Sequence, residues 1–256
     1  TISFDVDGKL PVDLPSVQRF WAAEYVPDKT ANKAVEVMQC VVCGRERPVL
    51  SRLLGKIKGV PGGQTSGTAI ISANSDAFES YGLEASLVAP TCAECGERFT
   101  TAANYLLASE QSRIVLGGAA MIFWTREEVG FSLRSHLDEP DAESVRALRE
   151  AVLRGTDTPA VDSTAFYATT LSGSGSRAVV RDWIDTTVGE VKRQLVRWFE
   201  WQSIVGQSGE DPRPLGIYAL AAATVRDAQK ELAPPTPRAL LHSALTGAPL
   251  PLSLLY

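Results

Sequence analysis

Apolar residues recur at helical spacing in several segments of the chain. Val17, Phe20 and Trp21 follow this spacing and predict a short helix over residues 15–25. The same period predicts a long helix over residues 187–204. Shorter helices are predicted over residues 48–54, 99–108, 141–153, 215–232 and 237–245. Asp141 is a suitable N-cap for the helix over 141–153, and Gly155 a suitable stop.

Short β-branched and apolar runs predict strands between these helices. The runs cover residues 34–42, 68–72, 114–124, 164–171 and 177–183, and Gly117-Gly118 interrupts the third. The turn Ser172-Gly173-Ser174-Gly175 separates the last two. Strands mixed with helices and then helices alone indicate an α+β fold, with a mainly helical C-terminal part. The expected division is an α+β domain over residues 1–185 and a helical segment over residues 186–256.

Composition supports a folded protein but does not by itself indicate a nucleic-acid binder. The chain has 256 residues, 45% of them hydrophobic, and a net charge of -5. A protein that contacts DNA usually carries a basic face, so any such contact here must come from a local patch or an assembly partner.

The first residues of the chain and its apolar runs give expectations about the cellular location of the protein. The chain opens Thr1-Ile2-Ser3 without a methionine or a secretory signal, so residues before Thr1 are expected to be missing. The apolar run over residues 114–124 is too short to span a membrane. With cysteines at metal spacing and no export signal, a cytoplasmic protein is expected.

Four cysteines form two Cys-x-x-Cys pairs, and a glycine follows each pair. Cys40 and Cys43 form the first pair, and Cys92 and Cys95 the second. Two such pairs make the tetrahedral thiolate cage that zinc prefers, so we predict a structural zinc ion on these four residues. Four buried free thiols are the alternative. A zinc deaminase is disfavoured, because its H-x-E motif is absent.

A glycine-rich loop over residues 55–67 is a candidate nucleic-acid contact. Residues 45–58 hold five basic residues and one acid, a local charge of +4 in a chain of net -5. Glycines permit close backbone approach to phosphate, and the amide of Gln64 can donate to and accept from a base edge. The predicted contacts in this region are Arg52, Lys56, Lys58, Gly62, Gly63, Gln64, Thr65 and Ser66. A flexible surface loop is the alternative.

Arg177 and Arg181 are four residues apart on a predicted strand, so simple alternation puts them on one face. They are predicted either to bind phosphate or to pair with acidic neighbours. Phe78 and Tyr81 suit base stacking, although burial in the core is the more common fate of such residues.

Several segments taken together resemble the Csd-type large subunit of the type I-C CRISPR surveillance complex, Cascade. They are KIKGVPGGQTSG at residues 56–67, AFESYG at 77–82, MIFW at 121–124, FY at 166–167, LS at 171–172, SRAVVRDW at 176–183, and residues 240–250. Around the second cysteine pair the chain departs from the family pattern Asn-Ala-Pro-Val-Ser, reading Ala89-Pro90-Thr91-Cys92 instead.

This resemblance implies a non-catalytic subunit of an RNA-guided complex in antiviral defence. It implies partners: guide RNA, other Cascade subunits, target double-stranded DNA and a recruited nuclease-helicase. The subunit would help to recognise the motif that flanks the target and to open the duplex. Family members are longer, which implies a further N-terminal segment and a C-terminal helical bundle. A zinc-stabilised scaffolding module without DNA contact is the alternative function.

Overall fold

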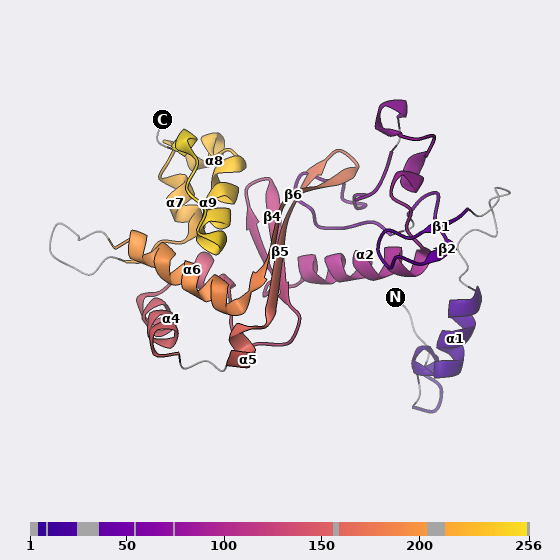
Figure 1. The fold of residues 1–256 in the computed structure, drawn as a ribbon, viewed down its shortest axis with the longest axis horizontal. Coiled ribbons are helices and arrows are strands. Elements are labelled where there is room, and N and C mark those ends of the chain that lie inside the picture. Colours follow the sequence, from indigo (N-terminus) through magenta and orange to yellow (C-terminus); the bar gives the residue numbers. More distant parts are fainter. Residues whose placement is uncertain are drawn as a thin grey trace. The chain divides into compact units, whose positions relative to one another are not determined.

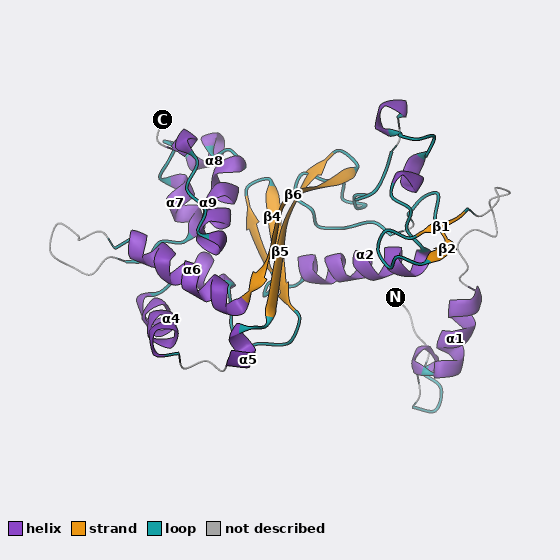
Figure 2. Cartoon of the chain, in the orientation of Figure 1, coloured by secondary structure: helices purple, strands orange, loops and turns teal. Residues whose placement is uncertain are grey.

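A computed structural model describes residues 5–8, 10–24, 36–53, 55–73, 75–155, 159–203 and 213–254. The side chains of residues 21–24, 229 and 253 are not described. The chain forms two compact units (Figures 1 and 2). One comprises Thr1–Leu53 and Ala73–Gly96, and the other Leu54–Ser72 and Glu97–Tyr256.

The first unit contains little regular structure. Helix α1 (Pro15–Glu24) lies near its start, and strands β1 (Val37–Gln39) and β2 (Glu46–Pro48) form a short antiparallel pair. Two 3-10 turns follow, η2 (Asp76–Phe78) and η3 (Ala85–Val88). Helix α2 (Ala93–Ala108) begins in this unit and continues into the second.

The second unit is built on a four-stranded antiparallel sheet in the order β3-β4-β5-β6. Its strands are β3 (Arg113–Leu116), β4 (Ala119–Thr125), β5 (Ala165–Ser174) and β6 (Arg177–Thr187). Gly117 closes the β3–β4 hairpin at φ +60°, which confirms the interruption predicted at Gly117-Gly118.

Alternation along the strands gives the sheet two apolar faces. Met121 and Phe123 of β4 belong to the main core, which also contains side chains of the helices. These helices are α3 (Arg134–Leu137), α4 (Ala142–Arg154), α6 (Val188–Trp201), α7 (Ile217–Ala222) and α9 (Pro235–Thr246). Ala120 and Ile122 point to the other face, where they cluster with Ile57 and Leu107. The segment of the glycine-rich loop and the end of α2 therefore cover this second face.

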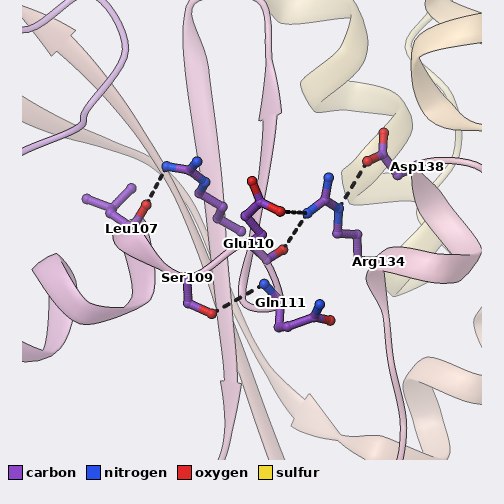
Figure 3. A network of polar contacts seen from close by, with 7 residues as sticks. Leu107, Ser109, Glu110, Gln111, Arg134 and Asp138 are labelled. Carbon is purple, nitrogen blue, oxygen red and sulfur yellow. Dashed lines mark hydrogen bonds and ion pairs between the residues drawn. The ribbon is translucent and has the colours of Figure 1, made fainter.

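Polar contacts link the end of α2 and the loop after it to strand β3 and helix α3 (Figure 3). Arg113 of β3 donates to the backbone oxygen of Leu107, which lies in the last turn of α2. Arg134 of α3 donates to the backbone oxygen of Glu110 and to the carboxylate of Asp138. The loop after α2 is thereby held both to the sheet and to α3.

The predicted ends of α4 are confirmed. The Asp141 side chain accepts hydrogen bonds from the backbone N–H groups of Glu143 and Ser144, and Gly155 adopts a left-handed conformation after Arg154. These are the two ends at which a helix leaves backbone groups without partners, so local sequence is sufficient to place them.

Four predicted elements differ in the structure. Of the strand predicted over 34–42, the described residues form only β1, and residues 41–43 are a turn. Residues 48–54 form no helix in their described part, because the N–H groups of Val49 and Leu50 donate to Glu36 and Thr91, distant in sequence. In the segment 68–72, Thr68 and Ala69 form isolated bridges and no strand is present. The helix over 215–232 is two helices, α7 and α8 (Ala228–Glu231). The Glu231 carboxylate accepts from the N–H groups of Arg226 and Asp227, which begins a new helix there.

The α+β class is confirmed by the two sheets and the helices. The elements after β6 are α6, α7, α8, α9 and the short turn η4 (Leu252–Leu254). The predicted division into two domains between residues 185 and 186 stays a prediction. The main hydrophobic core continues across this position. Ile184 of β6 and Val191 of α6 belong to one hydrophobic cluster. Residues 25, 34, 35 and 204, at the ends of predicted elements, lie outside the described residues.

Candidate metal centre and candidate nucleic-acid loop

The four cysteines come together within the first unit. Cys40 and Cys43 lie in the turn between β1 and β2, Cys92 precedes α2, and Cys95 is in its first turn. Their sulfur atoms all lie within 4.8 Å of one another. Sulfurs that bind one zinc ion at about 2.3 Å are separated by roughly 3.8 Å in a tetrahedron. The observed cluster is therefore of the right size for one tetrahedral ion.

Backbone hydrogen bonds join the two cysteine pairs. Val41 donates to the oxygen of Pro90, and Leu50 donates to the oxygen of Thr91. The N–H of Cys92 points to the Cys40 sulfur at 3.4 Å. Gly44, at φ +69°, donates to the oxygen of Cys40 and closes the first turn. The turns that present the sulfurs are thus held by the chain itself.

Burial and hydrogen bonding set the thiol chemistry of the cluster. Cys40, Cys92 and Cys95 are buried, whereas Cys43 is exposed. Burial alone would raise the pKa of Cys40, but N–H groups of Cys92, Cys43 and Val42 bond to its sulfur and lower the pKa to about 6. Burial, followed by hydrogen bonds with the other thiols, raises the pKa of Cys95. The Cys40 sulfur therefore favours the thiolate, the form that binds metal.

The donor set decides what a bound metal can do. Four sulfur donors suit zinc better than magnesium or calcium, which prefer oxygen. A zinc ion with four protein thiolates has no open position for water or substrate. The cluster is therefore suited to a structural ion. At its edge Arg47 pairs with Glu94 at 2.7 Å, so this arginine of the basic run already has a partner.

The glycine-rich loop lies in the second unit and brings its predicted contacts together. Ile57 and Thr68 exchange backbone hydrogen bonds of 2.8 and 2.7 Å, and both side chains are buried. Because side chains alternate on either side of Ile57, Lys56 and Lys58 are exposed. Both lysines lie beside Gly67, next to the exposed tip residues Gln64, Thr65 and Ser66.

Gly62 and Gly63 serve packing within the chain. Gly173 donates to the oxygen of Pro61 at 2.7 Å, and Gly63 forms a parallel bridge with Gly175. A Cβ on Gly63 would lie 2.5 Å from the Thr68 side chain. The close approach that was predicted toward phosphate is thus made to the β5–β6 hairpin. A nucleic-acid contact through Gly62 and Gly63 stays a prediction.

The arginines of the predicted site are distributed differently. Arg177 lies beside the loop, through a bridge with Ala69. Arg181 lies at a β-bulge, since Thr170 faces Asp182 and Leu171 faces Val180. Simple alternation therefore does not apply between the two arginines, and Arg181 donates to the Ser172 hydroxyl at 2.7 Å. Arg52 is exposed and belongs to the first unit.

Phe78 and Tyr81 are not buried in the core, although burial is the more common fate of aromatic residues. Phe78 is 55% exposed and Tyr81 fully exposed. Tyr81 has φ +56° and Gly82 has φ +71°, so the turn between Ser80 and Leu83 holds the phenol out. Trp198 and Phe199 are buried, whereas Trp183 is 55% exposed and its ring contacts those of Trp124 and Tyr167. The sequence AFESYG holds a signal for this turn in Tyr81-Gly82, because glycine permits positive φ.

The sequence patterns missed a hydrogen bond between strand β6 and helix α9. His242 Nδ1 lies 2.8 Å from the Asp182 carboxylate. The two residues are separated by 60 positions and belong to no motif, so only the tertiary structure brings them together.

Comparison with known proteins identifies a family. No curated protein matches this chain. The family model described as CRISPR-associated protein (Cas_Csd1) matches residues 1–256, and this match confirms the resemblance found in the sequence segments. The chain belongs to the Cas_Csd1 family of CRISPR-associated proteins.

Proposed function

We propose that this chain is a non-catalytic large subunit of a type I-C Cascade complex that contacts target DNA beside the guide-paired region. It assembles in the cytoplasm with guide RNA and other Cascade subunits, and a recruited nuclease-helicase performs cleavage. Base pairing with the guide reads most of the target, and this subunit helps to recognise the flanking motif and to open the duplex. Membership of a CRISPR-associated family supports the proposal.

The arrangement of the glycine-rich loop carries the proposal. Lys56 and Lys58 are exposed beside a tip of three polar side chains. Lysine ammonium groups suit phosphate oxygens, which carry no sequence information, whereas an amide suits a base edge. Lys56 and Lys58 therefore position the duplex, and Gln64 contributes to reading the flanking motif.

The anchoring of the loop favours this role over that of a flexible connector. Asn104 of α2 accepts from the Lys58 N–H at 2.7 Å and donates to the Lys56 oxygen at 3.0 Å. The backbone that carries both lysines is thus fixed on a helix, and less conformational entropy is lost on binding. Arg177, whose backbone is bridged to Ala69 beside the loop, belongs to the proposed contact set. Arg52 and Arg181 extend the proposed contact set.

We propose further that zinc is held by Cys40, Cys43, Cys92 and Cys95. The size of the sulfur cluster and its four-thiol composition support this. Bound zinc supplies a structural cross-link in the small first unit. Through this ion the two cysteine-bearing turns would be held together. The site has no role in a reaction.

The test is the affinity of the assembled complex for target duplexes that differ only in the flanking motif, measured at several salt concentrations. Replacing Lys56 and Lys58 by glutamine is expected to weaken binding to every duplex alike. The slope of log affinity against log salt should become shallower by about 0.9 for each phosphate group that a lysine no longer neutralises. Gln64→Ala is expected to cost about 1–3 kcal/mol on the preferred motif and less on the others.

A matched control separates local contact from net charge. Arg146 and Arg149 are exposed on α4, and replacing both by glutamine removes the same two charges. This control should leave affinity and salt slope unchanged. Gly62 and Gly63 are unsuitable for this test, since they pack against the hairpin. If the Lys56, Lys58 and Gln64 variants assemble and bind like the parent at every salt concentration, the zinc-stabilised scaffolding function is preferred.

A further inference from the structure

A small cavity opens in the second unit between strand β6 and helix α9. It has a volume of about 220 Å³ and is lined by Asp182 from β6, by Arg238, His242 and Ser243 from α9, and by Pro249 and Pro251 from the segment that follows. Sites for drug-sized ligands are usually about 300–1,000 Å³. This cavity therefore suits a small group rather than a drug-sized ligand.

Hydrogen bonds orient the imidazole in this cavity. His242 Nδ1 lies 2.8 Å from Asp182 Oδ2, and Asp182 Oδ1 accepts from the N–H of Trp183 at 2.9 Å. Both carboxylate oxygens thus have partners within the chain. Because Nδ1 is engaged, Nε2 is the ring nitrogen left for a ligand.

A cationic side chain, Arg238, lies one helical turn from the histidine. Arg238 and His242 are four residues apart on α9, so they share a face, and both line the cavity. Arg238 is half-buried, and among the described residues it has neither a hydrogen bond nor an ion pair. Its guanidinium therefore keeps donors for a ligand inside the cavity.

The charges of these groups select the class of ligand. Both carboxylate oxygens of Asp182 already have partners, whereas the Arg238 guanidinium has none among the described residues, so the charge presented to a ligand is positive. An arginine fork matches the oxygens of a phosphate group. Pro249 and Pro251 border the cavity and contribute no N–H group, so the polar contacts come from α9.

We propose that this cavity is a binding site for a phosphate-type oxyanion, held by Arg238 and by Nε2 of His242, with Asp182 as a positioning residue. The site uses residues other than the glycine-rich loop, so it does not depend on the proposed flanking-motif contact. The phosphate group has two possible sources: a free phosphate or monoester, or the phosphodiester backbone of a nucleic acid. Both present the same oxygens to the cavity.

The chain offers a direct spectroscopic readout, because it contains only two histidines, His136 and His242. The ring C–H signals of the full chain are recorded by NMR during titration with inorganic phosphate at constant ionic strength and pH. His242→Gln identifies its own signal. Phosphate is expected to shift the His242 signal saturably and to leave His136 unchanged. Titration with chloride should produce no such shift.

Variants separate a binding site from a structural contact. Arg238→Gln keeps the Asp182–His242 pair and is expected to weaken phosphate binding about tenfold or more, as for loss of a hydrogen bond to a charged group. Arg238→Lys should restore part of the affinity. Arg149→Gln, which removes a charge from the exposed face of α4, should bind phosphate like the parent.

Two further probes identify the source. A short single-stranded oligonucleotide without a terminal phosphate offers only diesters, and a nucleoside monophosphate offers only a monoester. A saturable His242 shift with either probe, weakened by Arg238→Gln, supports the site and names its source. No saturable shift with phosphate or either probe, or equal shifts in the parent and Arg238→Gln, would overturn the proposal. The Asp182–His242 pair would then only hold α9 against β6.

Discussion

Gly173 of strand β5 lies against the backbone of Gly63 so closely that a Cβ on Gly173 would stand 2.1 Å from the Gly63 nitrogen. No side chain fits at this distance. The contact attaches the glycine-rich loop to the β5–β6 hairpin, together with the hydrogen bond from Gly173 to Pro61. The presentation of Lys56 and Lys58 thus depends on a residue more than a hundred positions away in sequence.

Gly173→Ala is therefore expected to destabilise the second unit by about 1–3 kcal/mol, the usual cost of overpacking. The measurement is urea unfolding. Gly130→Ala is the control, because a Cβ at Gly130 meets nothing within 4 Å and its φ is not positive. Equal stability of the two variants would show that the loop does not need this contact.

Purified protein is expected to carry about one zinc ion per chain. Cys40→Ser should abolish zinc retention and lower the thermal stability of the first unit, because metal binding contributes to folding free energy. A strong chelator should do the same to the parent. Val42→Ala, in the same turn but without a sulfur, should retain zinc. Freshly purified protein without zinc, with four freely titratable thiols, would contradict this prediction.

Asp141→Ala is expected to lower the Tm at neutral pH. Hydrogen bonds from the Ser144 side chain and then from its backbone N–H lower the pKa of Asp141, so the folded state favours the carboxylate. Stability from this cap is present above the pKa of an unfolded aspartate, about 3.9, and is lost as pH falls through the lower folded value. The Tm difference between parent and variant should therefore shrink in acid.

Thermal unfolding across pH checks this behaviour. Glu139→Ala is the matched control, since it removes an exposed carboxylate just before the same helix without removing its cap. It should change Tm little at any pH. A pH-independent difference between the parent and Asp141→Ala would argue against the charged cap.

Tyr81→Asn is expected to stabilise the first unit. Tyr81 has φ +56° and is fully exposed, so it bears the cost of a left-handed conformation without contributing burial. Asparagine adopts this conformation more readily, and a rise in Tm of about 2–4 °C corresponds to a gain near 1 kcal/mol in a chain of this size. Tyr105→Asn is the control, because Tyr105 is exposed in helix α2. Asparagine should not stabilise there.

Local sequence was sufficient to predict the elements whose ends are marked by a capping residue or a turn glycine. Helix α4 begins at an Asp141 cap and ends at Gly155, and the hairpin between β3 and β4 turns at Gly117. Both features need only residues that are adjacent in the chain. The Cys-x-x-Cys spacing likewise predicted which four residues cluster. The segment resemblance predicted the family.

By itself the sequence determined the α+β class, the principal helices and the composition of the cysteine cluster. Only the tertiary structure decided that Leu50 bonds to Thr91, that Gly63 packs on Gly173, and that Asp182 meets His242. The physical reason is that these contacts join backbone groups and side chains from distant segments. These contacts contribute stabilising free energy only after the intervening chain has folded. Local periodicity and residue spacing therefore do not predict them.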